Sequence, residues 1–91
     1  MNRAVDKWID DHKEELIEAL RANLSIASVK DTEHASEGAP FGPMIRKALD
    51  DALARGKALG FDTVDYDGYC GAIDMPGGDE QLGVICHLDV V

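Results

Sequence analysis

The most informative stretch of this sequence is Leu82-Gly83-Val84-Ile85-Cys86-His87-Leu88-Asp89-Val90-Val91. Its valine, isoleucine and leucine residues are typical of a strand that is covered on both faces. Because residues two apart on a strand point the same way, we expect His87 and Asp89 to stand side by side. Polar groups inside an apolar strand need partners. A carboxylate beside an imidazole indicates a metal-bound histidine that an acid holds in orientation.

The residues before this stretch predict a hairpin. Phe61–Tyr66 alternates as a strand does, and Tyr69–Met75 is the predicted return strand. Between them Asp67-Gly68 is the strongest hairpin signal in the chain. The polar turn Pro76–Glu80 then leads into Gln81–Asp89, the third and most apolar predicted strand.

Two helices are predicted ahead of the hairpin. Residues 2–24 carry an apolar stripe at helical spacing, and we expect Trp8 in this stripe to lie in the core. The second helix is predicted to begin at Pro43 and to stop at Gly60. Between the helices, Ser25–Pro43 is predicted to be irregular because prolines and glycines crowd its end. The stripe of the first helix comprises Val5, Trp8, Ile9, Leu16, Ile17, Leu20 and Leu24.

Size and composition narrow the classes of protein that remain. The chain has 91 residues, enough for one domain, and its formal charge of −9 opposes binding to nucleic acid or to an anionic membrane. No apolar run is long enough to span a bilayer, and the N-terminus lacks the apolar core of a secretory signal, so we expect a cytoplasmic protein. Cys70 and Cys86 are expected to be buried thiols. Asp65 and Asp67, beside the predicted turn, are expected to be solvated.

The motif His87-Leu88-Asp89-Val90-Val91 resembles that of a known protein family. This motif on an apolar strand resembles the metal-binding opening of the zinc-dependent aminoacylase and dipeptidase family of metallopeptidases, which is carboxypeptidase G-like. A second match, Glu37-Gly38-Ala39-Pro40-Phe41-Gly42-Pro43, is similar to the segment ahead of the second helix in bacterial dinuclear-zinc dipeptidases. The resemblance implies an α/β fold with two helices, a β-hairpin and a third apolar strand. It also implies that residues 1–91 are a single partial domain, the N-terminal part of a larger metallopeptidase catalytic domain.

The resemblance also implies the chemistry of the site. Members of this family hold two zinc ions that activate water against the bond of a small peptide substrate. The residue matching His87 is a zinc ligand, and the residue matching Asp89 accepts a hydrogen bond from the other ring nitrogen. We therefore take His87 as the candidate metal ligand and Asp89 as the candidate acid of the catalytic site. The other ligands and the general base have no match here, so we expect the 91-residue chain alone to be inactive, because catalytic zinc needs about three protein ligands.

Other interpretations of the sequence remain open. The chain could be a stand-alone, non-enzymatic α/β interaction module that forms oligomers through its apolar strand. Self-association through Gln81–Val91 or through the other exposed strand edge is expected, because two helices cover only one face of the predicted sheet. A single-zinc protein using His12, His34 and His87 is disfavoured, since these histidines lack the spacing of metal ligands.

Overall fold

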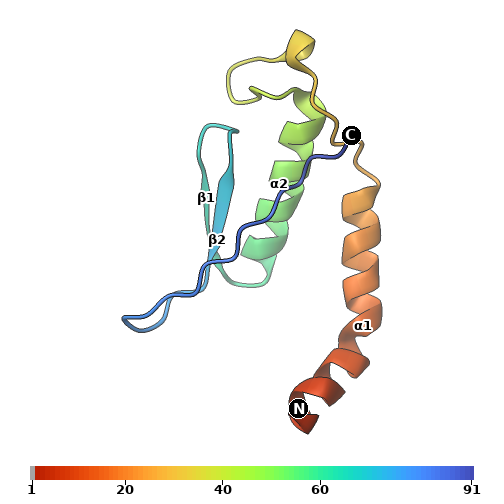
Figure 1. Cartoon of the computed structure of the whole chain (residues 1–91), viewed down its shortest axis with the longest axis vertical. Helices are drawn as coiled ribbons and strands as arrows, with labels where there is room; N and C mark the ends of the chain where they lie inside the picture. The colour runs from red at the N-terminus through yellow and green to blue at the C-terminus, as the bar shows by residue number, and fades with distance from the viewer. Residues whose placement is uncertain (1) are drawn as a thin grey trace.

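The computed structural model describes residues 2–91 and contains two helices followed by a β-hairpin (Figure 1). Helix α1 spans Arg3–Leu24 and helix α2 spans Pro43–Ala58, with one 3-10 turn, η1, at Thr32–His34 between them. Strands β1 (Asp62–Asp65) and β2 (Gly71–Asp74) pair antiparallel. This small α/β fold confirms the predicted helices and the predicted hairpin.

Helix α1 begins at a side-chain cap and leaves its apolar stripe in contact with solvent. The Asn2 Oδ1 atom accepts hydrogen bonds from the amides of Ala4 and Val5 at 3.0 and 3.3 Å, which satisfies two amides of the first turn. In Figure 1, α1 stands on the side of α2 opposite the hairpin. The expectation that Trp8 is a core residue is wrong: it is 59% exposed and stacks on the His12 ring, with centroids 3.9 Å apart.

The hairpin packs directly against helix α2, and this contact forms most of the core. Ala48 and Leu49 of α2 are buried, and Ile26, after α1, is the other buried hydrophobic residue among those described. A Cβ atom placed on Gly56 would lie 2.8 Å from Cγ2 of Ile73. A larger residue at Gly56 would therefore separate β2 from the helix.

The turn of the hairpin has the geometry that Asp67-Gly68 predicts. Asp67 has φ 57° and Gly68 has φ 80°, and two consecutive positive φ angles are what a type I′ turn requires. The Tyr69 amide donates to the Tyr66 carbonyl at 3.1 Å and closes the turn. The register pairs Asp62 with Asp74, so the hairpin is short and regular.

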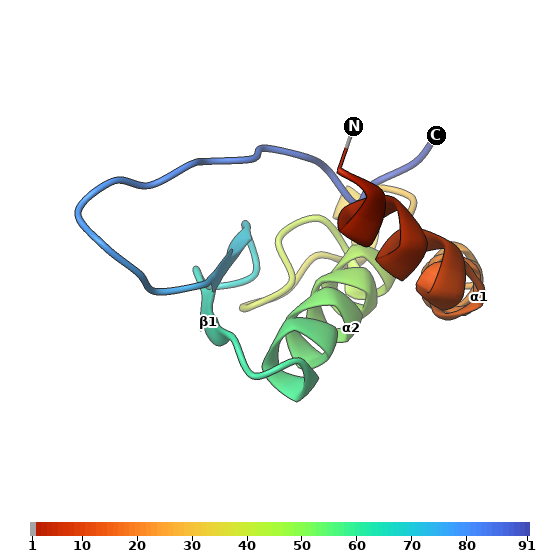
Figure 2. The same cartoon turned by 90° about the horizontal axis from the view of Figure 1, so that it is seen from below.

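The predicted third strand, Gln81–Asp89, is not formed in this structure, and that part of the prediction is wrong. Figures 1 and 2 show this segment swinging out beyond β2 and returning across the molecule. A hollow of about 940 Å³ lies between it and the face made by α2 and the hairpin. Directly after it, Val90 forms an isolated parallel bridge with Val29. A strand is stabilised by a hydrogen-bonded neighbour, and within residues 2–91 no strand lies alongside this segment.

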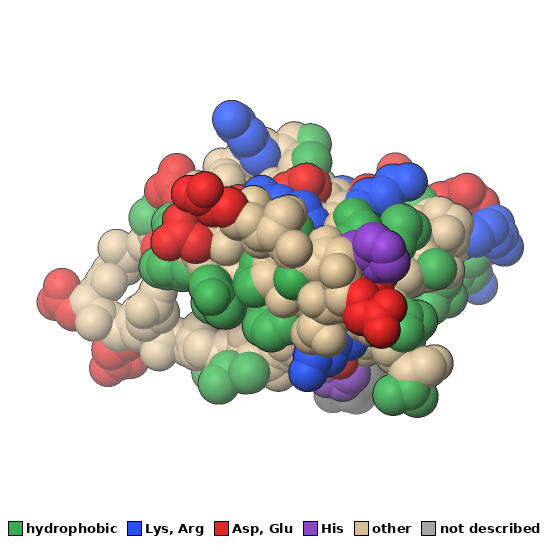
Figure 3. Space-filling view, turned by 90° about the horizontal axis from the view of Figure 1, so that it is seen from above, with side chains coloured by type: hydrophobic (Ala, Val, Ile, Leu, Met, Phe, Trp, Pro, Cys, Tyr) green, Lys and Arg blue, Asp and Glu red, His purple; other side chains and the backbone are tan. Residues whose placement is uncertain are grey.

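The surface mixes acidic and hydrophobic side chains, as the face in Figure 3 shows. Cys70 and Cys86 are both exposed free thiols, so the expectation that they are buried is wrong. Cys70 lies beside the hairpin turn, and Cys86 lies in the uncovered segment 81–89. Of the described helices, neither combines the length and the apolar character needed to cross a bilayer.

Candidate functional site

His87 and Asp89 lie side by side, as the two-residue spacing predicts. The Nδ1 atom of His87 is 3.1 Å from Oδ1 of Asp89 and also 3.1 Å from the Asp89 backbone carbonyl oxygen. The two side chains are 82% and 56% exposed, so packing covers little of His87 and less than half of Asp89. Their relative position is therefore set by the backbone and by these hydrogen bonds.

The hydrogen bonds of His87 indicate which ring nitrogen carries the proton. A backbone carbonyl oxygen can only accept a hydrogen bond, so Nδ1 is the donor. In the neutral ring Nε2 then keeps its lone pair, which is the form that binds a metal ion. Within residues 2–91, Nε2 makes no hydrogen bond, so this lone pair is open to a ligand.

Ser28, in the connection that follows α1, holds the backbone around Asp89. Its Oγ donates to the Leu88 carbonyl at 2.7 Å, and its own carbonyl accepts from the Val90 amide at 2.9 Å. Ser28 is only 4% exposed. The His87–Asp89 segment is thus attached to the body of the protein at this one end.

Among the described residues, His87 is suited to be one zinc ligand and Asp89 to be its hydrogen-bond partner. These two residues do not complete a zinc site. Across residues 2–91 no three His, Cys, Asp or Glu side chains converge in a way that could hold a metal ion. The three histidines also have separate hydrogen-bond partners in the structure. The Nδ1 atom of His12 contacts the Trp8 carbonyl at 2.7 Å, and that of His34 contacts Oδ2 of Asp31 at 2.8 Å.

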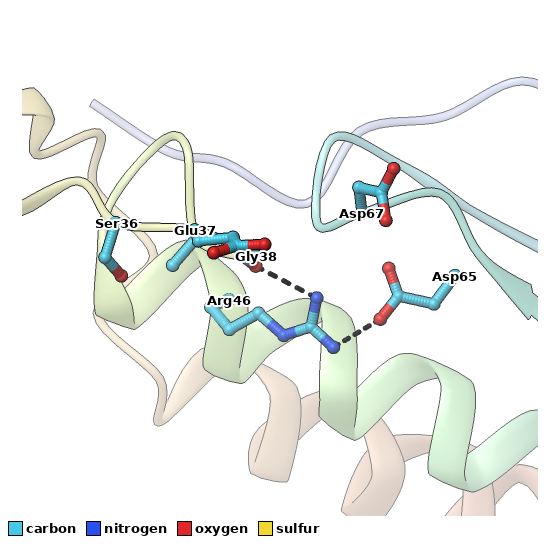
Figure 4. A pocket seen from close by; sticks show the side chains of 7 residues that line it. Ser36, Glu37, Gly38, Arg46, Asp65 and Asp67 are labelled. Carbon is cyan, nitrogen blue, oxygen red and sulfur yellow. Dashed lines mark hydrogen bonds and ion pairs between the residues drawn. The ribbon is translucent and has the colours of Figure 1, made fainter.

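A second polar cluster joins α2, the loop before it and the hairpin (Figure 4). The Arg46 guanidinium donates through Nη1 to the Gly38 carbonyl at 3.0 Å and through Nη2 to Oδ2 of Asp65. The Nη2 atom also lies 2.7 Å from Oδ1 of Asp50. The other oxygen of Asp65 accepts from the Gly68 amide at 2.9 Å. We call Arg46, Gly38, Asp65 and Gly68 the Arg46 clamp.

The clamp shifts the pKa values of its charged members. The Arg46 guanidinium, and after it the Gly68 amide, hold the pKa of Asp65 below its ordinary value. Asp65 and then Asp50 raise the pKa of Arg46. Asp65 is exposed, as expected, but its carboxylate also forms an ion pair with Arg46 that the sequence did not predict. No local pattern could have revealed the pair, since 19 residues separate Arg46 from Asp65.

No protein-family model matches the chain. A comparison with known proteins does find relatives. A protein of Staphylococcus epidermidis is 42% identical over 81 residues, which is 89% of this chain and 17% of the relative. Proteins of Staphylococcus haemolyticus and of Staphylococcus aureus strain USA300 are each 41% identical over 83 residues, 91% of this chain and 18% of theirs. All three are named "putative dipeptidase".

The relatives support the resemblance to dipeptidases. Their names agree with the expected likeness to dipeptidases, and the similarity covers nearly the whole chain. The chain spans less than a fifth of the length of the curated relatives it matches.

Proposed function

We propose that this chain is the N-terminal part of a zinc-dependent dipeptidase, in which His87 is a zinc ligand and Asp89 orients it. One observation carries the proposal: Nδ1 of His87 is held at 3.1 Å by Asp89, so Nε2 is left with its lone pair and no partner within residues 2–91. An imidazole fixed by a carboxylate in this way is the usual arrangement of a metal-bound histidine. The dipeptide substrate rests on the names of the relatives.

In this proposal each side chain has one defined task. Zinc, when bound, polarises a carbonyl group and lowers the pKa of a bound water to about 7. His87 supplies the Nε2 lone pair, and Asp89 keeps the proton on Nδ1 and stops the exposed ring from turning. The remaining ligands and the general base come from the part of a dipeptidase that this chain does not match. The 91-residue chain alone accordingly has no activity.

The proposal is tested by replacing the matched N-terminal segment of the Staphylococcus epidermidis relative with this chain. The chimaera is expected to hydrolyse dipeptides in the presence of zinc and to lose activity with a chelator. His87→Ala is expected to lower kcat/KM at least about 100-fold, because mutation of a residue that only orients a metal ligand already costs about 10–100-fold. Turnover is followed with a panel of dipeptides.

The matched control is His34→Ala. His34 is also an exposed histidine whose Nδ1 contacts a nearby aspartate, at 2.8 Å from Asp31. This variant is expected to keep the activity of the parent chimaera. Equal losses in the two variants, or dipeptide hydrolysis by the unfused 91-residue chain, would refute the assignment of His87.

A second candidate function, a non-enzymatic interaction module, is favoured by the exposed apolar segment. Side chains of segment 81–89 that would pack in a buried strand are instead in solvent, and Ile85 is 100% exposed. An uncovered apolar segment of this kind is typical of an interaction site. An inactive chimaera from a chain that self-associates would favour this function over the first.

A further inference from the structure

Ser28 stands out because it is a buried polar residue that contacts the candidate site from a distant part of the chain. It is 4% exposed and lies 60 residues from its partner Leu88. A hydroxyl buried in this way needs a hydrogen-bond partner, and the Ser28 Oγ donates to the Leu88 carbonyl at 2.7 Å. This contact is therefore a specific one and joins the connection after α1 to the end of segment 81–89.

The two hydrogen bonds of Ser28 act on the two peptide groups that flank the Cα atom of Asp89. The Leu88 carbonyl belongs to the peptide plane before Asp89, and the Val90 amide belongs to the plane after it. Val90 is held at 2.9 Å by the Ser28 carbonyl. Both dihedral angles of Asp89 are thereby restrained by a single residue.

The same two planes control the hydrogen bonds of His87. The Asp89 carbonyl, which accepts from Nδ1 of His87 at 3.1 Å, lies in one peptide plane with the Val90 amide that Ser28 binds. The Asp89 side chain leaves the Cα atom between the two planes, so its direction depends on both. Since His87 and Asp89 are mostly exposed, no packing replaces this restraint.

We propose that Ser28 is a positioning residue that aligns Asp89 with Nδ1 of His87 and so keeps Nε2 free for a metal ion. The metal-binding part of this inference rests on the proposed function, but the alignment itself does not. Removing the hydroxyl releases the Leu88 plane while the backbone bond to Val90 remains. The His87 ring then exchanges between its two neutral tautomers.

The test uses the metal-free 91-residue chain labelled with ¹⁵N, at a pH where its histidines are neutral. Long-range ¹H–¹⁵N spectra report the ratio of the Nδ1–H to the Nε2–H tautomer for each ring. Ser28→Ala is expected to lower this ratio for His87 about fivefold, the effect of losing one hydrogen bond. Ser28→Thr keeps the hydroxyl and is expected to restore the ratio. His12, on α1, is the internal control and is expected not to change.

Three results would overturn the proposal. One is an unchanged His87 ratio in Ser28→Ala, and another is a failure of Ser28→Thr to restore it. The third is loss of the cross-strand contacts of the hairpin in Ser28→Ala, which would make Ser28 a general stability residue. Because the measurement needs neither zinc nor turnover, it is independent of the chimaera: an inactive chimaera would refute the proposed function and leave the role of Ser28 standing.

Discussion

At the scale of single residues, the Arg46 clamp makes stability depend on pH. An unperturbed aspartate has a pKa of about 3.9, and the hydrogen bond from Arg46 lowers the pKa of Asp65 in the folded chain. A carboxyl group whose pKa is lowered on folding stabilises the fold above its unfolded pKa and loses this effect as the pH falls through its folded pKa. The clamp therefore contributes fully above about pH 3.9.

We predict that Asp65→Asn lowers the melting temperature at pH 6 and that this difference disappears in acid. The loss begins below about pH 3.9 and is complete once the pH has passed the lowered pKa of Asp65. Thermal unfolding of the wild-type chain and of Asp65→Asn is followed by circular dichroism between pH 2 and pH 7. A difference that stays constant to the lowest pH would show that the ion pair does not stabilise the fold.

The sequence predicts the His87–Asp89 pair but neither Ser28 nor the clamp. The side-by-side placement of the pair is predictable because alternate residues of an extended chain share a side. It is therefore present even though the predicted strand is not formed. Ser28 and Arg46 meet partners 60 and 19 residues away, so their roles depend on how the elements pack.

At the scale of elements, the contact between the hairpin turn and the loop before α2 depends on Gly68. Its φ of 80° is in the left-handed region, and an added Cβ would lie 2.0 Å from the Gly38 carbonyl oxygen. Both the strain and the steric clash oppose any side chain at this position. The turn and the Gly38 loop can approach closely only because the residue is glycine.

We predict that Gly68→Ala destabilises the fold by about 1–2 kcal/mol or more, the strain of a left-handed alanine before the clash is added. Gly78→Ala is the matched control, because its Cβ would meet no atom within 4 Å. It is expected to change stability by less than about 0.5 kcal/mol. Urea unfolding measures both variants, and equal effects would contradict the close contact at Gly68.

The elements were predictable to different degrees for physical reasons. The two helices and the hairpin carry local signals, such as Pro43 at a helix start and Asp67-Gly68 at a turn. Segment 81–89 has the composition of a buried strand, but a strand also needs a neighbour to bond with. Composition reports how apolar a segment is and cannot report whether another strand lies beside it.

At the scale of the whole molecule, the described residues bury little and expose much apolar surface. Among residues 2–91, three hydrophobic residues form the buried core. The stripe of α1 and Leu82, Val84 and Ile85 of segment 81–89 are exposed instead. Figures 1 and 2 show the backbone of α1 and of this segment at the periphery. Such surfaces favour association between copies of the chain.

We predict that the 91-residue chain self-associates and that segment 81–89 is the contact. Ile85→Lys places a charge where the side chain is 100% exposed, so it is expected to leave the fold intact and to shift the chain toward monomer. Sedimentation velocity over a range of concentrations measures the change. A wild-type chain that remains monomeric at high concentration would contradict the prediction.

Diffraction at the zinc absorption edge shows whether Nε2 of His87 binds zinc while Asp89 holds Nδ1. The sample is the zinc-loaded chimaera of this chain with the Staphylococcus epidermidis relative. We expect an anomalous peak at coordination distance from Nε2 of His87, with Asp89 still hydrogen-bonded to Nδ1. A zinc peak bound elsewhere, with His87 outside its coordination sphere, would contradict the account.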